Sequence, residues 1–344
     1  MPIDLRSDTV TRPTPEMRRA MMAAEVGDDQ YGEDPATNEL QARTAALLGK
    51  EAGLWLPSGT QANQVALMTL TRPGDEVIVA RESHALWHEA GGAARNAGVQ
   101  LTEIGEGGVF TAAEVTAALK PADHPLYPRT SLIEIENTHN RAGGVIFPQP
   151  EAERICALAH ARGVAVYLDG ARLWNVAAAT GATLAELAAP FDMAMVAFSK
   201  GLGAPGGSLL AGTTPMIAEA ARHRRQLGGA MRQIGFFAAA ALYGLDHHMA
   251  RLPEDHANAR DLAQRLAQVP GIALDLSTVQ TNIVIFRLTD EAPATAAVLA
   301  AAKDEGVLVS AFGPRTLRAV THLDVTAVQC RQAGDVLARI IGGR

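Results

Sequence analysis

Short runs of β-forming residues alternate with helical stretches from about residue 50 to residue 250, and this alternation constrains the fold more than any other feature. The predicted strands are nearly continuous in apolar residues, as strands buried on both faces must be; they cover residues 76–80, 99–104, 131–136, 164–169, 193–199 and 208–211. Helices are predicted between them at residues 61–71, 84–97, 112–120, 151–162 and 172–180. The pattern predicts an α/β fold with a mostly parallel sheet covered by helices on both faces.

A second region with a different pattern begins near Pro253. Helices are predicted there at residues 255–266, 294–305 and 326–341, and strands at 281–287, 307–310 and 316–321. We therefore expect a large domain over residues 1–250 and a small C-terminal α+β domain over residues 251–344. The first fifty residues are less regular and include a charged loop at residues 27–35, which is either solvated or part of a site.

Charge and hydropathy exclude several classes of protein. The net charge of −7 and the absence of a dense Lys/Arg run argue against a nucleic-acid partner. No apolar stretch is long enough to span a bilayer, and the N-terminus has no apolar leader segment. The two cysteines, Cys156 and Cys330, lie far apart and are expected to be reduced thiols. These features predict a cytoplasmic protein, and we assign no residue to a metal site.

Polar residues with different chemistry follow the predicted strands, where ligands of α/β proteins bind. Asp169 ends one strand, and Lys200 follows the next strand and precedes a glycine-rich turn. Gly59 and Thr60 stand at the start of a helix. Taken singly, each has an ordinary explanation: a helix-capping aspartate, a solvated surface amine and a capping turn. Their combination within one sheet edge is more informative than any one of them.

Pyridoxal phosphate is a cofactor that uses all three features. Backbone N–H groups at a helix N-terminus bind phosphate, a carboxylate pairs with a protonated ring nitrogen, and a lysine amine forms an imine with an aldehyde. The sequence thus predicts that Lys200 holds pyridoxal phosphate as a Schiff base, with Asp169 at the pyridine nitrogen and Gly59 and Thr60 at the phosphate.

Six motifs resemble those of the low-specificity L-threonine aldolases, in order and at the family's spacing, from residue 3 to about residue 325. They are Asp4-Leu5-Arg6-Ser7-Asp8-Thr9-Val10-Thr11-Arg12-Pro13, Pro57-Ser58-Gly59-Thr60-Gln61-Ala62-Asn63, Glu136-Asn137-Thr138-His139-Asn140, Asp169-Gly170-Ala171-Arg172, Ser199-Lys200-Gly201-Leu202-Gly203 and Thr321-His322-Leu323-Asp324. The resemblance implies the fold type I, aspartate-aminotransferase-like architecture and usually a homotetramer built of dimers. It also implies a lyase that cleaves β-hydroxy-α-amino acids, such as threonine, allo-threonine and phenylserine, to glycine and an aldehyde.

The resemblance also implies roles for single residues. Lys200 and Asp169 match the Schiff-base lysine and the partner of the ring nitrogen, and His84 matches a histidine stacked on the cofactor. The phosphate contacts of the family are matched by Gly59, Thr60 and Arg232, and in one interpretation a neighbouring subunit supplies Arg232. The groups that hold the substrate carboxylate are matched by Ser7, Arg172 and Arg318, and Arg172 is also expected beside the cofactor. Tyr31 is expected to reach a partner's site. His84 and His139 are both candidates for the base that takes the β-hydroxyl proton, and a structural histidine is the alternative for His139.

Two residues depart from the family pattern. His88 stands where relatives carry an aromatic residue, one helical turn after His84, and is expected to line the pocket for the substrate side chain. We expect it to alter side-chain preference or threo/erythro selectivity. Arg225 replaces a common lysine near the phosphate region and keeps its charge.

Three other functions compete with aldol cleavage. Another fold type I lyase, such as one acting by β-elimination on an amino acid or a hydroxymethyltransferase-like enzyme, would use the same cofactor. A dinucleotide-dependent oxidoreductase would need a Gly-x-Gly-x-x-Gly turn after the first strand, which is absent. A binding protein without activity would be expected to lose Lys200 or Asp169. The sequence leaves open the preferred aldehyde, the selectivity at the β-carbon and the oligomer size.

Overall fold

The computed structural model describes residues 2–121 and 124–343, and a seven-stranded sheet forms its centre. The strand order is β2-β8-β7-β6-β5-β3-β4. The bounds are β2 (Ala52–Leu56), β3 (Glu76–Ala80), β4 (Gln100–Ile104), β5 (Thr130–Glu136), β6 (Ala165–Gly170), β7 (Met193–Ala197) and β8 (Ser208–Gly212). Strands β3 to β7 pair in parallel, whereas β8 pairs antiparallel with both β7 and the edge strand β2. The predicted mostly parallel sheet is confirmed.

Helices cover both faces of this sheet because successive strand residues point to opposite sides. Along β5 and β6, Ile133 and Val166 join one hydrophobic core, while Leu132 and Tyr167 join another. The first face packs against helices α2 (Pro35–Leu47), α5 (Ala112–Ala118), α6 (Gln149–His160), α7 (Leu173–Thr180), α8 (Leu184–Ala188) and α10 (Gly235–His247). The second face packs against α3 (Gly59–Leu70) and α9 (Thr214–Gln226).

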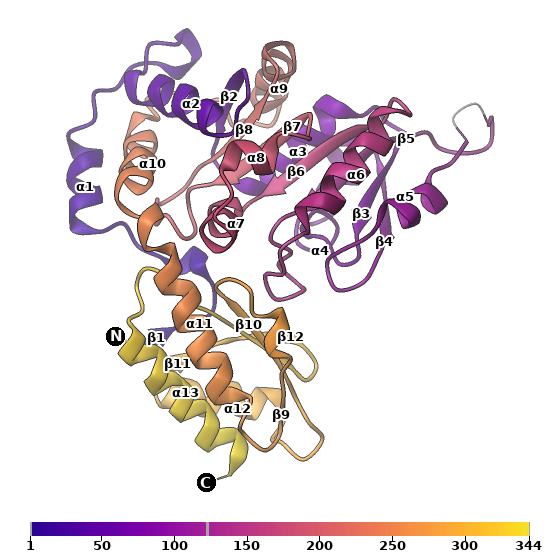
Figure 1. Cartoon of the computed structure of the whole chain (residues 1–344). Helices are drawn as coiled ribbons and strands as arrows, with labels where there is room; N and C mark the ends of the chain where they lie inside the picture. The colour runs from indigo at the N-terminus through magenta and orange to yellow at the C-terminus, as the bar shows by residue number, and fades with distance from the viewer. Residues whose placement is uncertain (1, 122–123, 344) are drawn as a thin grey trace.

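The C-terminal region forms a separate lobe, seen at the bottom of Figure 1. Its four-stranded antiparallel sheet has the order β12-β13-β10-β9, with β9 (Ile272–Ala273), β10 (Ile283–Leu288), β12 (Ser310–Gly313) and β13 (Thr316–Val320). Helices α11 (Leu252–Leu266), α12 (Thr295–Asp304) and α13 (Ala327–Gly342) pack with it around a hydrophobic core of their own.

The N-terminal residues pack in this C-terminal lobe. Strand β1 (Ile3–Asp4) pairs in parallel with β11 (Val307–Leu308), and Ile3 and Leu5 are buried in the core of the lobe. The sequence pattern predicts these residues in the large domain instead, and the domain boundary at residue 250 remains a prediction. The chain then crosses from this lobe to α1 (Pro15–Met22), which packs on the large domain, so the N-terminal segment passes between the two lobes.

One local prediction was wrong, and several elements were not predicted. The helix expected over residues 84–97 is broken into α4 (His84–Trp87) and a π-helical turn, η3 (Ala93–Ala97). Ala90 and Gly91 between them adopt positive φ values of 53° and 75°, which a right-handed helix does not allow. Strand β2 was not predicted, and the first fifty residues contain α1 and α2. Within the described residues, no helix is both long and apolar enough to cross a membrane.

Candidate active site

A cavity of about 200 Å³ lies at the carboxyl ends of β5, β6 and β7. Asp169 on β6, Lys200 just after β7, and Gly59 and Thr60 at the start of α3 all line it. The remaining lining residues are Thr9, Asn63, His84, Glu136, Asn140, Ala171, Arg172, Met195 and Ser199. The topology thus brings together the amine, the carboxylate and the helix N-terminus that the sequence placed up to 141 positions apart, from Gly59 to Lys200.

The Lys200 amine lies in a strongly charged environment. Burial and the neighbouring Arg172 guanidinium lower its pKa to about 8, against the opposing effect of the Asp8, Asp169 and Glu136 carboxylates. Desolvation disfavours the charged ammonium form. A larger fraction of this amine is therefore neutral near pH 7 than for an ordinary lysine, and a neutral amine is the form that attacks an aldehyde.

The Asp169 carboxylate is almost fully buried, with 1% of the residue exposed. Its Oδ1 accepts the backbone N–H of Ala171 at 3.0 Å, and its Oδ2 accepts the side-chain amide of Asn63 at 2.8 Å. Both partners are donors, so each carboxylate oxygen acts as a hydrogen-bond acceptor. A buried carboxylate held in this way can pair with a protonated ring nitrogen.

The start of α3 provides the site for an anion. Ser58 caps the helix by accepting the Gln61 N–H at 3.1 Å, which leaves the preceding N–H groups of Gly59 and Thr60 at the cavity wall. A Cβ atom on Gly59 would lie 3.1 Å from the Met195 side chain, so glycine keeps this wall open. Together with Lys200 and Asp169, this donor set fits the phosphate, the aldehyde and the ring nitrogen of pyridoxal phosphate.

His84 lies at the mouth of the cavity, whereas His139 does not. The Nδ1 atom of His84 lies 3.0 Å from Glu89 Oε1, which leaves Nε2 as the free ring nitrogen. His139 is 1% exposed, and its Nδ1 accepts the Ala142 N–H at 3.1 Å. His139 lines neither this cavity nor the adjoining one, so the structure brings only His84 to the other predicted site residues.

A second cavity of about 200 Å³ adjoins the first, since Thr9, His84, Asn140, Arg172 and Lys200 line both. Its other lining residues are Ser7, His88, Phe312 and Arg318. The rings of His88 and Phe312 are nearly parallel, at 17°, with centroids 6.2 Å apart. The predicted carboxylate anchors Ser7, Arg172 and Arg318 therefore lie together beside the predicted cofactor site.

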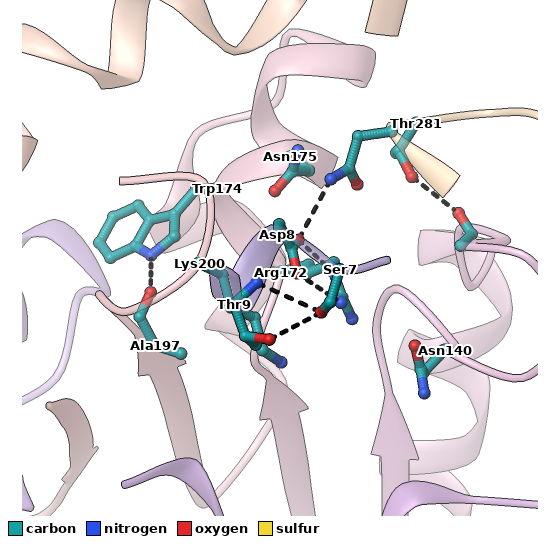
Figure 2. Close-up of polar contacts among 12 residues, drawn as sticks. Ser7, Asp8, Thr9, Asn140, Arg172, Trp174, Asn175, Ala197, Lys200 and Thr281 are labelled. Carbon is teal, nitrogen blue, oxygen red and sulfur yellow. Dashed lines mark hydrogen bonds and ion pairs between the residues drawn. The ribbon is translucent and has the colours of Figure 1, made fainter. Parts of the chain in front are cut away.

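The two arginines are held by different partners. Arg172, at the N-terminal end of α7, donates from Nε and Nη2 to the two carboxylate oxygens of Asp8, at 2.7 and 2.8 Å (Figure 2). Arg318, on β13, donates to the side-chain oxygen of Asn140 at 2.8 Å and to the carbonyl of Arg6 at 3.0 Å. Burial and the nearby Arg172 and Arg141 lower the pKa of Arg318 to about 10 despite the Asp8 carboxylate. Each guanidinium is thus fixed beside the second cavity.

Comparison with known proteins agrees with this site. Residues 4–289 match the beta-eliminating lyase family. The chain is 42% identical to the low specificity L-threonine aldolase of Escherichia coli strain K12, over 95% of this chain and 96% of the relative. It is 39% identical to low-specificity L-threonine aldolase 1 of Arabidopsis thaliana, over 94% and 92%. The chain belongs to the low-specificity L-threonine aldolase family.

Solved structures of other proteins share the fold. A threonine aldolase from Leishmania major superposes with a TM-score of 0.83 at 22% identity, covering 98% of this chain and 99% of that one. A putative L-allo-threonine aldolase from Listeria monocytogenes gives a TM-score of 0.81 at 23% identity, covering 99% and 96%. The predicted fold type I architecture is confirmed. Membership of the aldolase family also confirms the predicted enzyme class, a carbon–carbon lyase, and its cofactor, pyridoxal phosphate.

Two residues matched to the aldolase family lie outside both cavities. Tyr31 is 76% exposed at the end of the turn η2 (Asp29–Tyr31). Arg232 pairs with Asp28 at 3.0 Å, and its backbone carbonyl accepts the Asp29 N–H, so both residues share one surface loop region. Neither reaches the cavities of its own chain.

Sequence reasoning missed several residues that build the aldolase site. Asp8 holds Arg172, Asn63 holds Asp169, Glu89 contacts His84 and Asn140 holds Arg318. Asp8, Asn63 and Asn140 stand inside motifs that carried the family resemblance, and Glu89 follows His88 directly. Position within a motif was the available signal, but it did not show which partner each residue contacts.

Proposed function

We propose that this chain cleaves L-threonine, L-allo-threonine and related β-hydroxy-α-amino acids such as phenylserine to glycine and an aldehyde. One observation carries the proposal: the cavity with Lys200, Asp169 and the α3 N-terminus shares a wall with the cavity of Ser7, Arg172 and Arg318. The first has the groups that pyridoxal phosphate needs, and the second has two cations and a hydroxyl for an amino-acid carboxylate. A substrate held in the second cavity lies directly beside the cofactor site.

The residues of the first cavity would hold the cofactor. Lys200 would bind it covalently, Asp169 would pair with its ring nitrogen, and the N–H groups at Gly59 and Thr60 would bind its phosphate; His84 and Arg172 lie beside them. Pyridoxal phosphate, when bound, accepts the electron pair left at Cα when the Cα–Cβ bond breaks. The protein's task is then to hold the substrate and to move protons.

Arg172, Arg318 and Ser7 carry out the first task. A guanidinium presents parallel N–H groups that match a carboxylate and fix its plane. Arg172 uses Nε and one Nη2 bond on Asp8, and this leaves Nη1 for a ligand in the cavity. The rest of the amino acid would then meet the other residues of the second cavity, among them His84, His88 and Phe312.

His84 is our proposed base for the β-hydroxyl proton. Its Nε2 is free and it lines both cavities. Burial opposes protonation, but the Glu89 hydrogen bond and the charges of Asp169 and Glu136 outweigh it, so the pKa of His84 is raised. His139 is disfavoured by its position, since its Nδ1 is already occupied and it lines neither cavity.

A second copy of the chain would complete the site. Tyr31 and Arg232 are exposed in one surface loop region and line neither cavity of their own chain. This favours the expectation that they act in the site of a neighbouring subunit. We propose a homotetramer built of dimers with shared sites. The cytoplasm is the compartment we infer, and the two buried, unpaired cysteines, Cys156 and Cys330, agree with it.

A product assay of the purified holoenzyme tests the function. The substrates are L-threonine, L-allo-threonine, phenylserine and 3-hydroxyaspartate, with the D-isomers as controls, and glycine and aldehyde are quantified together. We expect one glycine per aldehyde from L-isomers, a yellow wild-type protein, and no turnover in Lys200→Ala. Release of ammonia and an oxo acid in place of glycine would favour β-elimination. Cleavage of D-isomers alone would contradict the proposal.

A further inference from the structure

A buried hydrogen-bond network connects two residues of the proposed site, Asp169 and His84, through Asn63 and Glu89. The side-chain nitrogen of Asn63 donates to Asp169 Oδ2 and to Glu89 Oε1, each at 2.8 Å. The same Glu89 oxygen lies 3.0 Å from His84 Nδ1. Asn63 and Glu89 are 1% and 4% exposed, so water does not compete for these bonds.

The orientation of the Asn63 amide is fixed by a third residue. The Tyr167 hydroxyl donates to Asn63 Oδ1 at 2.7 Å, so the amide nitrogen must face the two carboxylates. An amide nitrogen has two hydrogens and can serve both acids at once. The opposite orientation would place a carbonyl oxygen against two carboxylates, which is unfavourable in a buried site.

Glu89 is surrounded by donors. Asn63 donates to Oε1 and the Gln64 amide donates to Oε2, and its side chain has no exposed surface. Both oxygens of this carboxylate thus act as hydrogen-bond acceptors. The contact with His84 therefore requires a proton on Nδ1, which leaves the Nε2 lone pair as the only basic position of the neutral ring.

We propose that Glu89 is a positioning residue that fixes His84 as the Nδ1–H tautomer with a basic Nε2 at the cavity. Asn63, through its two hydrogen bonds, holds the Glu89 and Asp169 carboxylates in fixed positions relative to each other. The inference rests on the proposed function, because His84 is its base. It assigns Glu89, which lines neither cavity, a task in the reaction that is carried out through His84.

Other charged groups around His84 have to be considered in any pH dependence. Glu136 at the end of β5 accepts the His84 backbone N–H at 2.8 Å, and Asp169 on β6 also raises the pKa of His84. His88 lies 5.3 Å away between ring centroids. The cations that share a cavity wall with His84 are Arg172, Lys200 and Arg318. Among the residues that the structure describes, Glu89 alone contacts a ring nitrogen of His84, so replacing it tests the proposed coupling most directly.

The first test reads the tautomer directly in the wild-type holoenzyme. Histidines are labelled with nitrogen-15, and the His84 signals are assigned by their loss in His84→Asn. We expect the neutral ring to carry its proton on Nδ1. A proton on Nε2 would overturn the proposal. This measurement needs no turnover, so it stands even if the proposed cleavage reaction is not found.

The second test compares pH profiles of kcat/KM for Glu89→Gln and a control, Glu103→Gln. Activity should rise with pH as His84 loses its proton. Removal of the Glu89 charge should lower the pKa of this rise by about one unit or more, so the variant keeps activity to lower pH. Glu103 is exposed and contacts the same turn from outside, through the Glu82 N–H and the Trp87 indole. Its variant should keep the wild-type profile.

The outcomes separate the two proposals. A wild-type enzyme that releases no glycine contradicts the proposed function, whereas an active wild type with an unchanged profile in Glu89→Gln contradicts the positioning role. In a His84→Asn background, Glu89→Gln should cause no further loss of kcat, because Glu89 would act through His84. A full additional loss would overturn the proposal. If Glu89→Gln does not fold, the tautomer measurement decides.

Discussion

The Asp8 carboxylate binds both Nε and Nη2 of Arg172, at 2.7 and 2.8 Å, and the pair is buried at 0% and 5% side-chain exposure. The two residues come from different parts of the chain, since Asp8 follows β1 in the C-terminal lobe and Arg172 precedes α7 in the large domain. Asn282, from the loop before β10, also donates to Asp8 at 3.1 Å. The pair thus joins the lobes and aligns the Arg172 guanidinium with the second cavity.

Asp8→Asn should therefore damage both stability and substrate binding. Removal of one partner leaves the Arg172 charge buried and unpaired, which costs about 3–5 kcal/mol. We expect a lower melting temperature and a higher KM for L-threonine, measured by calorimetry and by a coupled aldehyde assay. Asp4→Asn is the matched control because the Asp4–Arg6 pair lies at the surface, where about 0–1 kcal/mol is expected. Equal effects of both variants would refute the role of the buried pair.

The stability difference between wild type and Asp8→Asn should depend on pH. Although burial raises the pKa of Asp8, the charge and hydrogen bonds of Arg172 lower it well below its ordinary value. The ionised pair contributes stability above the unfolded-state pKa of about 4, and this contribution is lost as the pH falls. We expect the two melting temperatures to converge below about pH 4. A constant difference at all pH values would contradict this linkage.

Reconstitution of the apoenzyme should follow the ionisation of Lys200. Burial and Arg172 lower the pKa of this amine to about 8, and only the neutral amine attacks the aldehyde. The rate of pyridoxal phosphate uptake, followed by the return of visible absorbance, should rise with pH through a midpoint near 8. An ordinary lysine would give a midpoint near 10.4. Lys200→Ala, which cannot bind the aldehyde covalently at this position, serves as the blank.

Local patterns were sufficient to predict the central strands. Glu76–Ala80 is a strand with the predicted bounds, and β5, β6 and β7 begin within one residue and end within two residues of the prediction. These strands are buried on both faces, so their apolar runs are continuous. Strand β2 was not predicted, because Ala52–Leu56 follows a helix and pairs with β8, a strand more than 150 residues later in the sequence. Pairing over that distance has no local signal.

Site residues were predictable where their chemistry is distinctive. An amine, a carboxylate and a glycine turn at predicted strand or helix ends were enough to group Lys200, Asp169 and Gly59 into one site from the sequence alone. Asp8, Asn63 and Glu89 were not found, because each acts through a contact with a residue remote in sequence or across a broken helix. The His84–His88 proximity was expected from a regular helix; the rings do lie 5.3 Å apart, although that helix ends at Trp87.

Arg318→Lys should weaken substrate binding more than it slows turnover. Arg318 is held by Asn140 and the Arg6 carbonyl, so its planar guanidinium is prepared for a carboxylate. Lysine keeps the charge but not the parallel donors. Loss of a charge-assisted bond costs about 1.5–3 kcal/mol, so KM for L-threonine should rise roughly ten- to a hundred-fold. Arg287→Lys, on the exposed side of β10, is the control. An unchanged KM in Arg318→Lys would remove this residue from the carboxylate site.

His88→Phe tests whether the departure from the family pattern sets selectivity. Burial, together with His84, Arg141 and Arg318, lowers the pKa of His88 despite Glu136, so the ring is neutral at pH 7 and can exchange hydrogen bonds with a polar substrate group. Phenylalanine keeps a ring beside Phe312 but removes both nitrogens. One such bond is worth about 1 kcal/mol, so the ratio of kcat/KM for L-threonine and L-allo-threonine should change about five-fold. Total activity should persist, because Lys200, Asp169 and His84 are untouched.

His88→Ala completes this test by removing the ring as well. If the nitrogens matter, His88→Phe and His88→Ala should shift the threonine to allo-threonine ratio in the same direction, and only His88→Ala should also lose preference for phenylserine. The loss of preference for phenylserine is expected because His88→Ala removes one of the two rings that line the pocket. Only the Phe312 ring, whose centroid lies 6.2 Å from that of His88, would then remain. A His88→Phe variant with the wild-type ratio of kcat/KM for L-threonine and L-allo-threonine would show that the shape of the His88 ring, and not its nitrogens, matters for selectivity.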